Sequence, residues 1–310
     1  MQRFYPTPRP NTLHDKVMKD LSQKRFMPPS GTGSEVRIAA VFGMDDEARA
    51  ALERLIFLSK SQKVGVAGRF MPDANVSAQL AVLGIAEEVE DADFFKFKAV
   101  VIPYGGISPR QRREYEEEGY LLEDLTSPQV RRAQVALGLL RMEGAQPLVI
   151  GRHEDPESLA ISGGNSGARI LQDTTDTARL LFSPAFGVVC QTTLSPRRVA
   201  WLVQQLRHRW RDSRVTFLNT ISPAMMAREQ ALERLLVDCE RVVIVGESGE
   251  SSCEALVETA LRRGKTAVVV ANPDELNPAD FPAGEKVALT AGAFADAEAI
   301  RAVAEVLIGK

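Results

Sequence analysis

The sequence predicts an α/β fold built from small parallel sheets, and three observations predict it. From residue 36 onward, short apolar runs rich in β-branched residues alternate with longer amphipathic segments, the pattern of strands joined by helices. Most runs are apolar through their middle, as strands buried on both faces of a parallel sheet are. The expected strands also form three successive groups of three. Each group spans roughly 70–100 residues, too few for a full doubly wound sheet, so we expect three small α/β units rather than a single large one.

The expected elements alternate regularly along the chain. Each expected strand is an apolar run of six to eight residues; the runs are 36–42, 63–68, 98–105, 146–151, 186–192, 214–219, 241–247, 265–272 and 286–292. Between and after them, apolar residues recur with a helical period; the expected helices lie near 45–60, 109–118, 128–142, 195–211, 223–239, 251–263 and 293–308.

Proline content separates the first 35 residues from the rest of the chain. Prolines at positions 6, 8, 10, 28 and 29 interrupt any sustained period, so residues 1–35 are predicted to form a flexible tail with space for one helix at 11–25. The strand groups then predict α/β domains at 36–126, 127–221 and 222–310, the last of which ends in the C-terminal helix.

The composition excludes several classes of protein. Of the 310 residues, 45% are hydrophobic and 25% charged, as in globular rather than disordered chains. A net charge of −3 argues against a dedicated nucleic-acid binder, and no apolar run reaches the roughly 18–20 residues of a membrane helix. The N-terminus lacks an apolar signal segment, and three cysteines make no disulfide framework. We therefore expect a cytoplasmic protein with no nucleic-acid or membrane partner.

Five motifs lie at expected strand ends, where open α/β sheets bind their ligands. They are Leu148-Val149-Ile150-Gly151 followed by Asp155-Pro156-Glu157; Gln191-Thr192-Thr193-Leu194-Ser195; Asn219-Thr220-Ile221; Val245-Gly246 followed by Ser251-Ser252; and Leu289-Thr290-Ala291-Gly292-Ala293. In this order and spacing they resemble the LytB/IspH family, the 4-hydroxy-3-methylbut-2-enyl diphosphate reductases of isoprenoid synthesis. The resemblance covers about residues 36–308 and implies a pseudo-threefold trefoil of three small α/β domains around a central cavity.

The resemblance implies a 4Fe-4S cluster, but the residues that would hold it are replaced. Family members hold the cluster through three cysteines, one in each domain, and the matching positions here carry Met44, Ser127 and Ser222. Clusters are held by thiolates, and a serine hydroxyl hardly ionises at neutral pH, so we predict no cofactor. Cys190 and Cys253 are either small buried side chains, which we prefer, or part of a rearranged metal site. By family the chain is an oxidoreductase, yet these residues argue against the reductase reaction.

The diphosphate pocket that the resemblance implies is altered as well. The family histidines that bind the phosphate end of the substrate match Pro72, Gly105 and Asp155. The family's Ser-Ser-Asn loop becomes Gly249-Glu250-Ser251-Ser252, and a further serine becomes Phe294. A helix N-terminus preceded by Gly and Ser would favour an anion, whereas the carboxylates of Glu247, Glu250 and Asp155 would oppose one. These replacements argue against the family's own diphosphate substrate.

Two functional positions of the family are retained. Glu157 matches its proton-relay glutamate and Thr192 its substrate-side threonine. We take both as catalytic candidates, with Glu157 as a general acid or base if the cavity raises its pKa. The ligand-binding candidates are polar residues at the same strand ends: Ser127, Ser222, Arg152, His153, Thr193, Ser251 and Ser252.

Several of these candidates have a purely structural alternative. Ser127 and Ser222 each precede a proline that opens an expected helix, so each is expected to cap that helix and can also contact a ligand. No G-x-S-x-G elbow or nearby histidine supports a serine nucleophile. His153, together with Arg152, is either a substrate contact or part of a half-exposed loop.

Three functions stay open at this stage. The main hypothesis is a LytB/IspH-like protein without cluster ligands that binds a small molecule in the central cavity, or catalyses non-redox chemistry there. The second is a pseudoenzyme that serves as a binding or scaffold module, with a protein partner held through the N-terminal tail. The third is a 4-hydroxy-3-methylbut-2-enyl diphosphate reductase whose cluster has atypical ligands.

Overall fold

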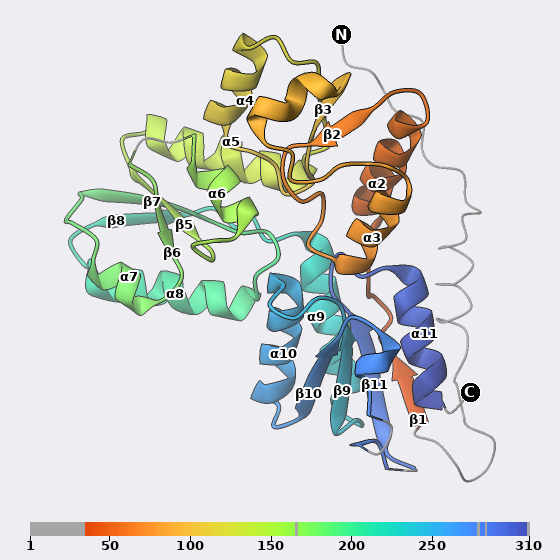
Figure 1. The fold of residues 1–310 in the computed structure, drawn as a ribbon. Helices are drawn as coiled ribbons and strands as arrows, with labels where there is room; N and C mark the ends of the chain where they lie inside the picture. Colours follow the sequence, from red (N-terminus) through yellow and green to blue (C-terminus); the bar gives the residue numbers. More distant parts are fainter. Residues whose placement is uncertain (1–34, 165–166, 278–279, 283, 309–310) are drawn as a thin grey trace. The chain divides into compact units, whose positions relative to one another are not determined.

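The computed structural model describes residues 35–164, 167–277, 280–282 and 284–308 (Figure 1). These residues form an α/β fold with strands in three parallel sheets, which confirms the predicted fold class. The chain divides into two compact units, Met1–Ala50 with Gln230–Lys310 and Ala51–Glu229, and each is described by itself. The predicted tail, with its helix at 11–25, lies outside the described residues except for Glu35. No described helix is long and apolar enough to cross a membrane.

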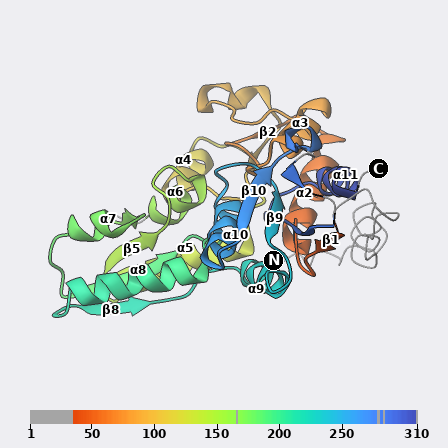
Figure 2. The ribbon, with the colours of Figure 1, turned by 90° about the horizontal axis from the view of Figure 1, so that it is seen from below.

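The first unit contains a four-stranded sheet with the order β1-β11-β9-β10 and parallel pairing throughout. The central strands β9 and β11 are almost fully buried, as their apolar sequences predict. Figures 1 and 2 show α10 and α11 on opposite faces of this sheet. The elements of the unit are β1 (Glu35–Ile38), β9 (Arg241–Val245), α10 (Ser251–Arg262), β10 (Thr266–Val270), η2 (Pro273–Glu275), β11 (Lys286–Ala291) and α11 (Ala297–Ile308).

The second unit contains two sheets, with the strand orders β2-β3-β4 and β6-β5-β7-β8, again with parallel pairs. Their strands are β2 (Val64–Val66), β3 (Ala99–Ile102), β4 (Leu122–Asp124), β5 (Gln146–Ile150), β6 (Arg169–Leu171), β7 (Ala185–Cys190) and β8 (Arg214–Phe217). In the larger sheet, α5 and α6 pack on one face and α7 and α8 on the other (Figure 1).

The helices outside the first sheet complete the description. They are α3 (Ala74–Val82), η1 (Asp91–Lys96), α4 (Pro109–Glu117), α5 (Pro128–Met142), α6 (Pro156–Ser162), α7 (Thr174–Ala178) and α8 (Pro196–Arg209), together with α2 (Asp46–Ser59) and α9 (Pro223–Leu235), in which the unit boundaries fall. Each of the seven expected helices after the tail is present, with ends shifted by a few residues at most.

The structure differs from the sequence-based prediction in two ways. The first expected strand pairs with the last, Val36 opposite Val287, instead of with the two strands that follow it in sequence, because an apolar run does not specify its neighbour. Elements with short apolar runs were also missed. The edge strands β4 and β6 have three residues each, and α3, α6 and α7 are short helices that begin at Asp73, Asp155 and Asp173, whose carboxylates accept backbone N–H bonds.

Candidate functional site

Glu157 and Thr192, the two predicted catalytic residues, are in direct contact. Glu157 lies in the first turn of α6, which Asp155 caps by accepting a hydrogen bond from the Glu157 N–H at 2.9 Å. Thr192 follows the last residue of β7, the strand beside β5. The Thr192 N–H donates to Glu157 Oε1 at 2.5 Å, and the Glu157 side chain is largely buried. The carboxyl ends of two neighbouring parallel strands therefore bring the pair together.

Gln191, which was not among the predicted site residues, forms hydrogen bonds between the segments that follow β5 and β7. Its Oε1 accepts hydrogen bonds from Ser158 Oγ at 3.2 Å and from the Arg152 N–H at 3.4 Å. Its Nε2 donates to Thr193 Oγ1 at 3.3 Å. The close packing of Ser158 against residue 151 requires a glycine there, since a Cβ on residue 151 would overlap the Ser158 hydroxyl. The position of Gln191 inside the Gln-Thr-Thr motif is the signal that was available in the sequence.

Ser127 and Ser222 cap helices, as predicted, and both lie near the Glu157 edge. Ser127 Oγ accepts from the Gln129 N–H at 3.2 Å, and Ser222 Oγ accepts from the Met225 N–H at 3.0 Å. The Ser222 N–H donates to the Thr192 carbonyl at 2.9 Å, so these two segments touch.

Ser127 reaches the same neighbourhood through the loop after β3. Its N–H donates to the Tyr104 carbonyl at 2.9 Å. The next residue, Gly105, lies against α6, because a Cβ at that position would be 3.9 Å from the Glu157 nitrogen. Four candidates, two predicted as catalytic and two as ligand contacts, are therefore linked through short backbone segments of one unit.

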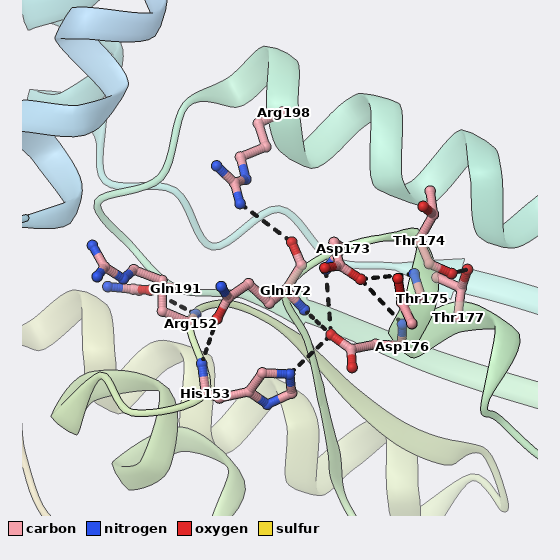
Figure 3. Close-up of polar contacts among 10 residues, drawn as sticks. All are labelled: Arg152, His153, Gln172, Asp173, Thr174, Thr175, Asp176, Thr177, Gln191 and Arg198. Atoms are coloured by element: carbon pink, nitrogen blue, oxygen red, sulfur yellow. Dashed lines mark hydrogen bonds and ion pairs between the residues drawn. The ribbon is translucent and has the colours of Figure 1, made fainter.

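His153 makes a contact that the sequence did not predict (Figure 3). Its Nε2 lies 2.9 Å from Asp176 Oδ2, and its N–H donates to Gln172 Oε1 at 3.0 Å. The same Asp176 oxygen accepts from the Gln172 N–H at 2.8 Å, which fixes the carboxylate. Asp173, which caps α7, accepts hydrogen bonds from the Thr175 and Asp176 N–H groups, and these bonds lower its pKa below the ordinary value.

The His153 ring is therefore tied to α7 rather than to Glu157. Figure 3 shows it pointing toward Asp176, while the guanidinium of Arg152 lies away from it. Arg198, from the first turn of α8, donates to the Gln172 carbonyl at 3.3 Å on the same side of the sheet. About half of the His153 side chain is exposed, so it is a loop residue whose ring is held by a hydrogen bond with Asp176.

In the first unit, Ser251 and Ser252 bind a carboxylate of their own chain. Glu250 caps α10: it accepts from the Ser252 N–H at 2.9 Å, the Cys253 N–H at 3.1 Å, the Ser251 hydroxyl at 3.3 Å and the Ser252 hydroxyl. The Ser252 hydroxyl also accepts from the Ala293 N–H at 2.7 Å. Burial raises the pKa of Glu250, despite hydrogen bonds that favour the ionised form. The place where a helix N-terminus would hold an anion is occupied by Glu250.

The donors of the described residues do not fit an iron–sulfur cluster. Of the three residues that the resemblance matches to the cluster cysteines, Met44 is buried in the first unit, and the hydroxyls of Ser127 and Ser222 accept helix N–H bonds. All three cysteines are free and buried. Burial raises the pKa of the Cys190 thiol to about 11, so it stays protonated at neutral pH. The described residues also contain no cluster of three His, Cys, Asp or Glu side chains placed to hold a metal ion.

Comparisons with known proteins identify the family. The family model described as LytB protein matches residues 42–308. The chain is similar to a 4-hydroxy-3-methylbut-2-enyl diphosphate reductase of Methylibium petroleiphilum, with 32% identity over 221 residues that cover 70% of this chain and 67% of that protein. Its similarity to a protein of the same name from Symbiobacterium thermophilum is 26% over 252 residues, 78% of this chain and 84% of that protein.

A solved structure has the same fold. It is the E-1-hydroxy-2-methyl-but-2-enyl-4-diphosphate reductase from Plasmodium falciparum, which matches with a TM-score of 0.79 and 21% identity over 88% of this chain and 87% of that one. The match extends across both units of the chain. The family model and the relative with 32% identity confirm the resemblance that the motifs predicted: the chain belongs to the LytB family.

Proposed function

We propose that this LytB-family protein binds a small molecule at the carboxyl edge of β5 and β7 and carries out non-redox chemistry on it, with Glu157 as general acid or base. The contact between Glu157 Oε1 and the Thr192 N–H, 2.5 Å long and buried, carries this proposal. Acid–base catalysis needs a side chain held within hydrogen-bond reach of its target. Thr193, Ser222 and Ser127 supply nearby polar groups for orientation.

Two features support a ligand other than a diphosphate and a reaction other than reduction. Glu250 already accepts the Ser252 and Cys253 N–H groups at the N-terminus of α10, so the donors that would hold a phosphate group there are taken. The positions of the family's cluster cysteines carry no thiolate. A cytoplasmic location is part of the proposal, because three free thiols suit a reducing compartment.

The test combines a binding screen with one substitution. A metabolite panel is screened by thermal shift, since a ligand that binds only the folded state raises the melting temperature. With the ligand found, Glu157→Gln is expected to abolish turnover while binding changes only a few-fold. Glu154→Gln, an exposed neighbour in the same loop, is the matched control and should leave both unchanged. Turnover that survives in Glu157→Gln contradicts the proposal.

Binding without turnover in the wild type would favour a different class of function. The chain would then be a binding or scaffold module, and its proposed protein partner would be sought with the N-terminal tail. Removal of residues 1–34 tests that point, because the loss of a partner but not of the small ligand is expected only if the tail carries the interaction.

The second candidate is 4-hydroxy-3-methylbut-2-enyl diphosphate reductase. The names of the similar proteins support this function more directly than they support a non-redox one, whereas the donor set argues against it. Iron and acid-labile sulfide are measured after anaerobic purification. A brown protein with stoichiometric iron and sulfide that reduces the diphosphate would establish the reductase with atypical ligands, and a colourless, iron-free protein would exclude it.

A further inference from the structure

We propose that a pocket between α4, β4 and α5 is a binding site for a small organic oxyanion with an apolar body, either a carboxylate or a phosphate ester. The pocket has a volume of about 390 Å³ and lies wholly within the second unit. Small-ligand sites typically begin at about 300 Å³. None of its lining residues is a candidate for the Glu157 site, so the inference does not depend on the proposed function.

Two arginines supply the positive charge of the pocket. Arg112, from α4, donates through Nη1 to Asp124 Oδ2, and Arg131, from α5, forms an ion pair in which its Nη2 lies 3.0 Å from Asp124 Oδ1. Asp124, the last residue of β4, is mostly buried between them and also accepts from the Thr126 N–H at 3.0 Å. Within the pocket lining, two guanidinium groups therefore face one carboxylate, and Glu116, which pairs with Arg112, lies outside the lining.

Part of each guanidinium is still available to a ligand. Arg131 uses only Nη2, which reaches Asp124 Oδ1 and the Asp124 carbonyl. Arg112 uses Nη1 for Asp124 and Nε for Glu116 at 3.0 Å. The remaining nitrogens, Nε and Nη1 of Arg131 and Nη2 of Arg112, donate to no partner among the described residues. A guanidinium presents five N–H groups in a planar fork, and oxyanions accept two of them at once.

Asp124 orients the guanidinium groups of Arg112 and Arg131 before a ligand binds. Burial acts to raise the pKa of Asp124, but hydrogen bonds from Thr126 and Arg112 outweigh it and hold the pKa below the ordinary value. The carboxylate is thus ionised at neutral pH and orients the arginines. Fixed donors cost less conformational entropy on binding than mobile ones.

The other walls of the pocket are apolar or rigid. Ile107, Pro109 and Val135 line it with aliphatic groups, and Val135 is largely exposed. Gln134 Nε2 donates to the carbonyls of Ile107 and Ala160, both at 2.9 Å, which fixes this wall. An anion with a hydrocarbon or ring portion therefore fits better than a bare inorganic ion.

The test uses phenyl phosphate, benzoate, inorganic phosphate and benzyl alcohol as probes on the full chain, with binding measured by NMR titration at low ionic strength. For such small probes we expect a Kd on the order of 1 mM for at least one of the two aromatic anions. Inorganic phosphate and benzyl alcohol should bind about tenfold more weakly, because phosphate lacks the apolar body and benzyl alcohol lacks the anionic group. The two aromatic anions distinguish a carboxylate site from a phosphate-ester site.

A matched pair of substitutions assigns the binding to the pocket. Arg131→Gln should weaken the better aromatic anion about tenfold, whereas Arg132→Gln removes the same charge one residue away, outside the pocket lining, and should change little. Circular dichroism checks that both variants fold. Equal effects of the two substitutions, binding of benzyl alcohol as tight as that of the anions, or no binding of either aromatic anion would overturn the proposal. Glu157→Gln should not affect this binding, which separates it from the proposed function.

Discussion

The replacement of Glu250 by alanine tests whether this side chain occupies an anion position. The substitution removes the N-cap of α10, a loss of about 1 kcal/mol. That loss consists of the missing acceptor for the Ser252 and Cys253 N–H groups, and it is larger here because both groups are buried, at about 1–3 kcal/mol for each unsatisfied group. Water entry and relief from a buried carboxyl group offset part of this sum. We expect a loss of about 2–3 kcal/mol, or a fall in melting temperature of about 3–5 °C for a chain of this length.

Urea unfolding followed by circular dichroism measures the loss, and two variants serve as controls. Glu250→Asp keeps a carboxylate at the cap and should recover much of the stability. Glu258→Ala removes a half-exposed glutamate from the same helix, away from the cap, and should cost no more than about 0.5 kcal/mol. A loss below about 1 kcal/mol in Glu250→Ala would show that the carboxylate is not a structural anion.

Phosphate provides the sharper readout for the same variant. If Glu250 fills an anion position, inorganic phosphate should raise the melting temperature of Glu250→Ala and leave the wild type nearly unchanged, because a ligand stabilises only a protein that has room for it. An equal rise in both proteins would refute the reasoning.

Three further predictions follow from the second unit. Asp124→Asn should destabilise the protein by about 1–3 kcal/mol at neutral pH. Because the folded-state pKa of Asp124 lies below 3.8, the stabilisation by its carboxylate is complete above about pH 4 and is lost as the pH falls through the folded pKa. The stability difference between the two proteins, measured by urea unfolding, should therefore shrink in acid, and an increase would contradict the prediction. Cys190, with its pKa raised to about 11, should resist iodoacetamide at pH 8 in the native state and react in urea. Gly151→Ala should lower the free energy of unfolding by about 1–3 kcal/mol, because its Cβ would overlap the Ser158 hydroxyl. The loss should be smaller when Ser158 is also replaced by alanine, and additive losses in the double variant would argue against the overlap.

The sequence predicted those features that depend on residues close together in the chain, and it did not predict pairings between distant residues. Buried strands such as β9 and β11 stand out because their apolar runs are continuous, and the contact of Glu157 with Thr192 follows from the rule that parallel strands end at one edge. The partner of β1 was not predictable, because Val36 and Val287 lie at opposite ends of the chain.

The side-chain pairings were less accessible to sequence reasoning. Asp176 contacts His153 across 23 positions, and its carboxylate also belongs to the capping box of a five-residue helix with no apolar run. The role of Glu250 was missed because a glutamate is an uncommon N-cap, for which Ser, Thr, Asp and Asn are preferred. Only the structure shows that its carboxylate reaches two N–H groups of its own helix.

The structure explains the positions of Cys190 and Cys253 by packing rather than by metal binding. Cys253 Sγ lies 2.5 Å from where a Cβ would stand on either Gly246 or Gly292, so its place is set by close packing between backbone segments. Cys190 packs with its thiol 3.4 Å from Thr220 Oγ1. Ser127 and Ser222, which the resemblance matches to two cluster cysteines, accept hydrogen bonds from helix N–H groups. Replacing both serines by cysteine would remove two caps, at about 1 kcal/mol each, so the serines have a structural role that does not depend on any cluster.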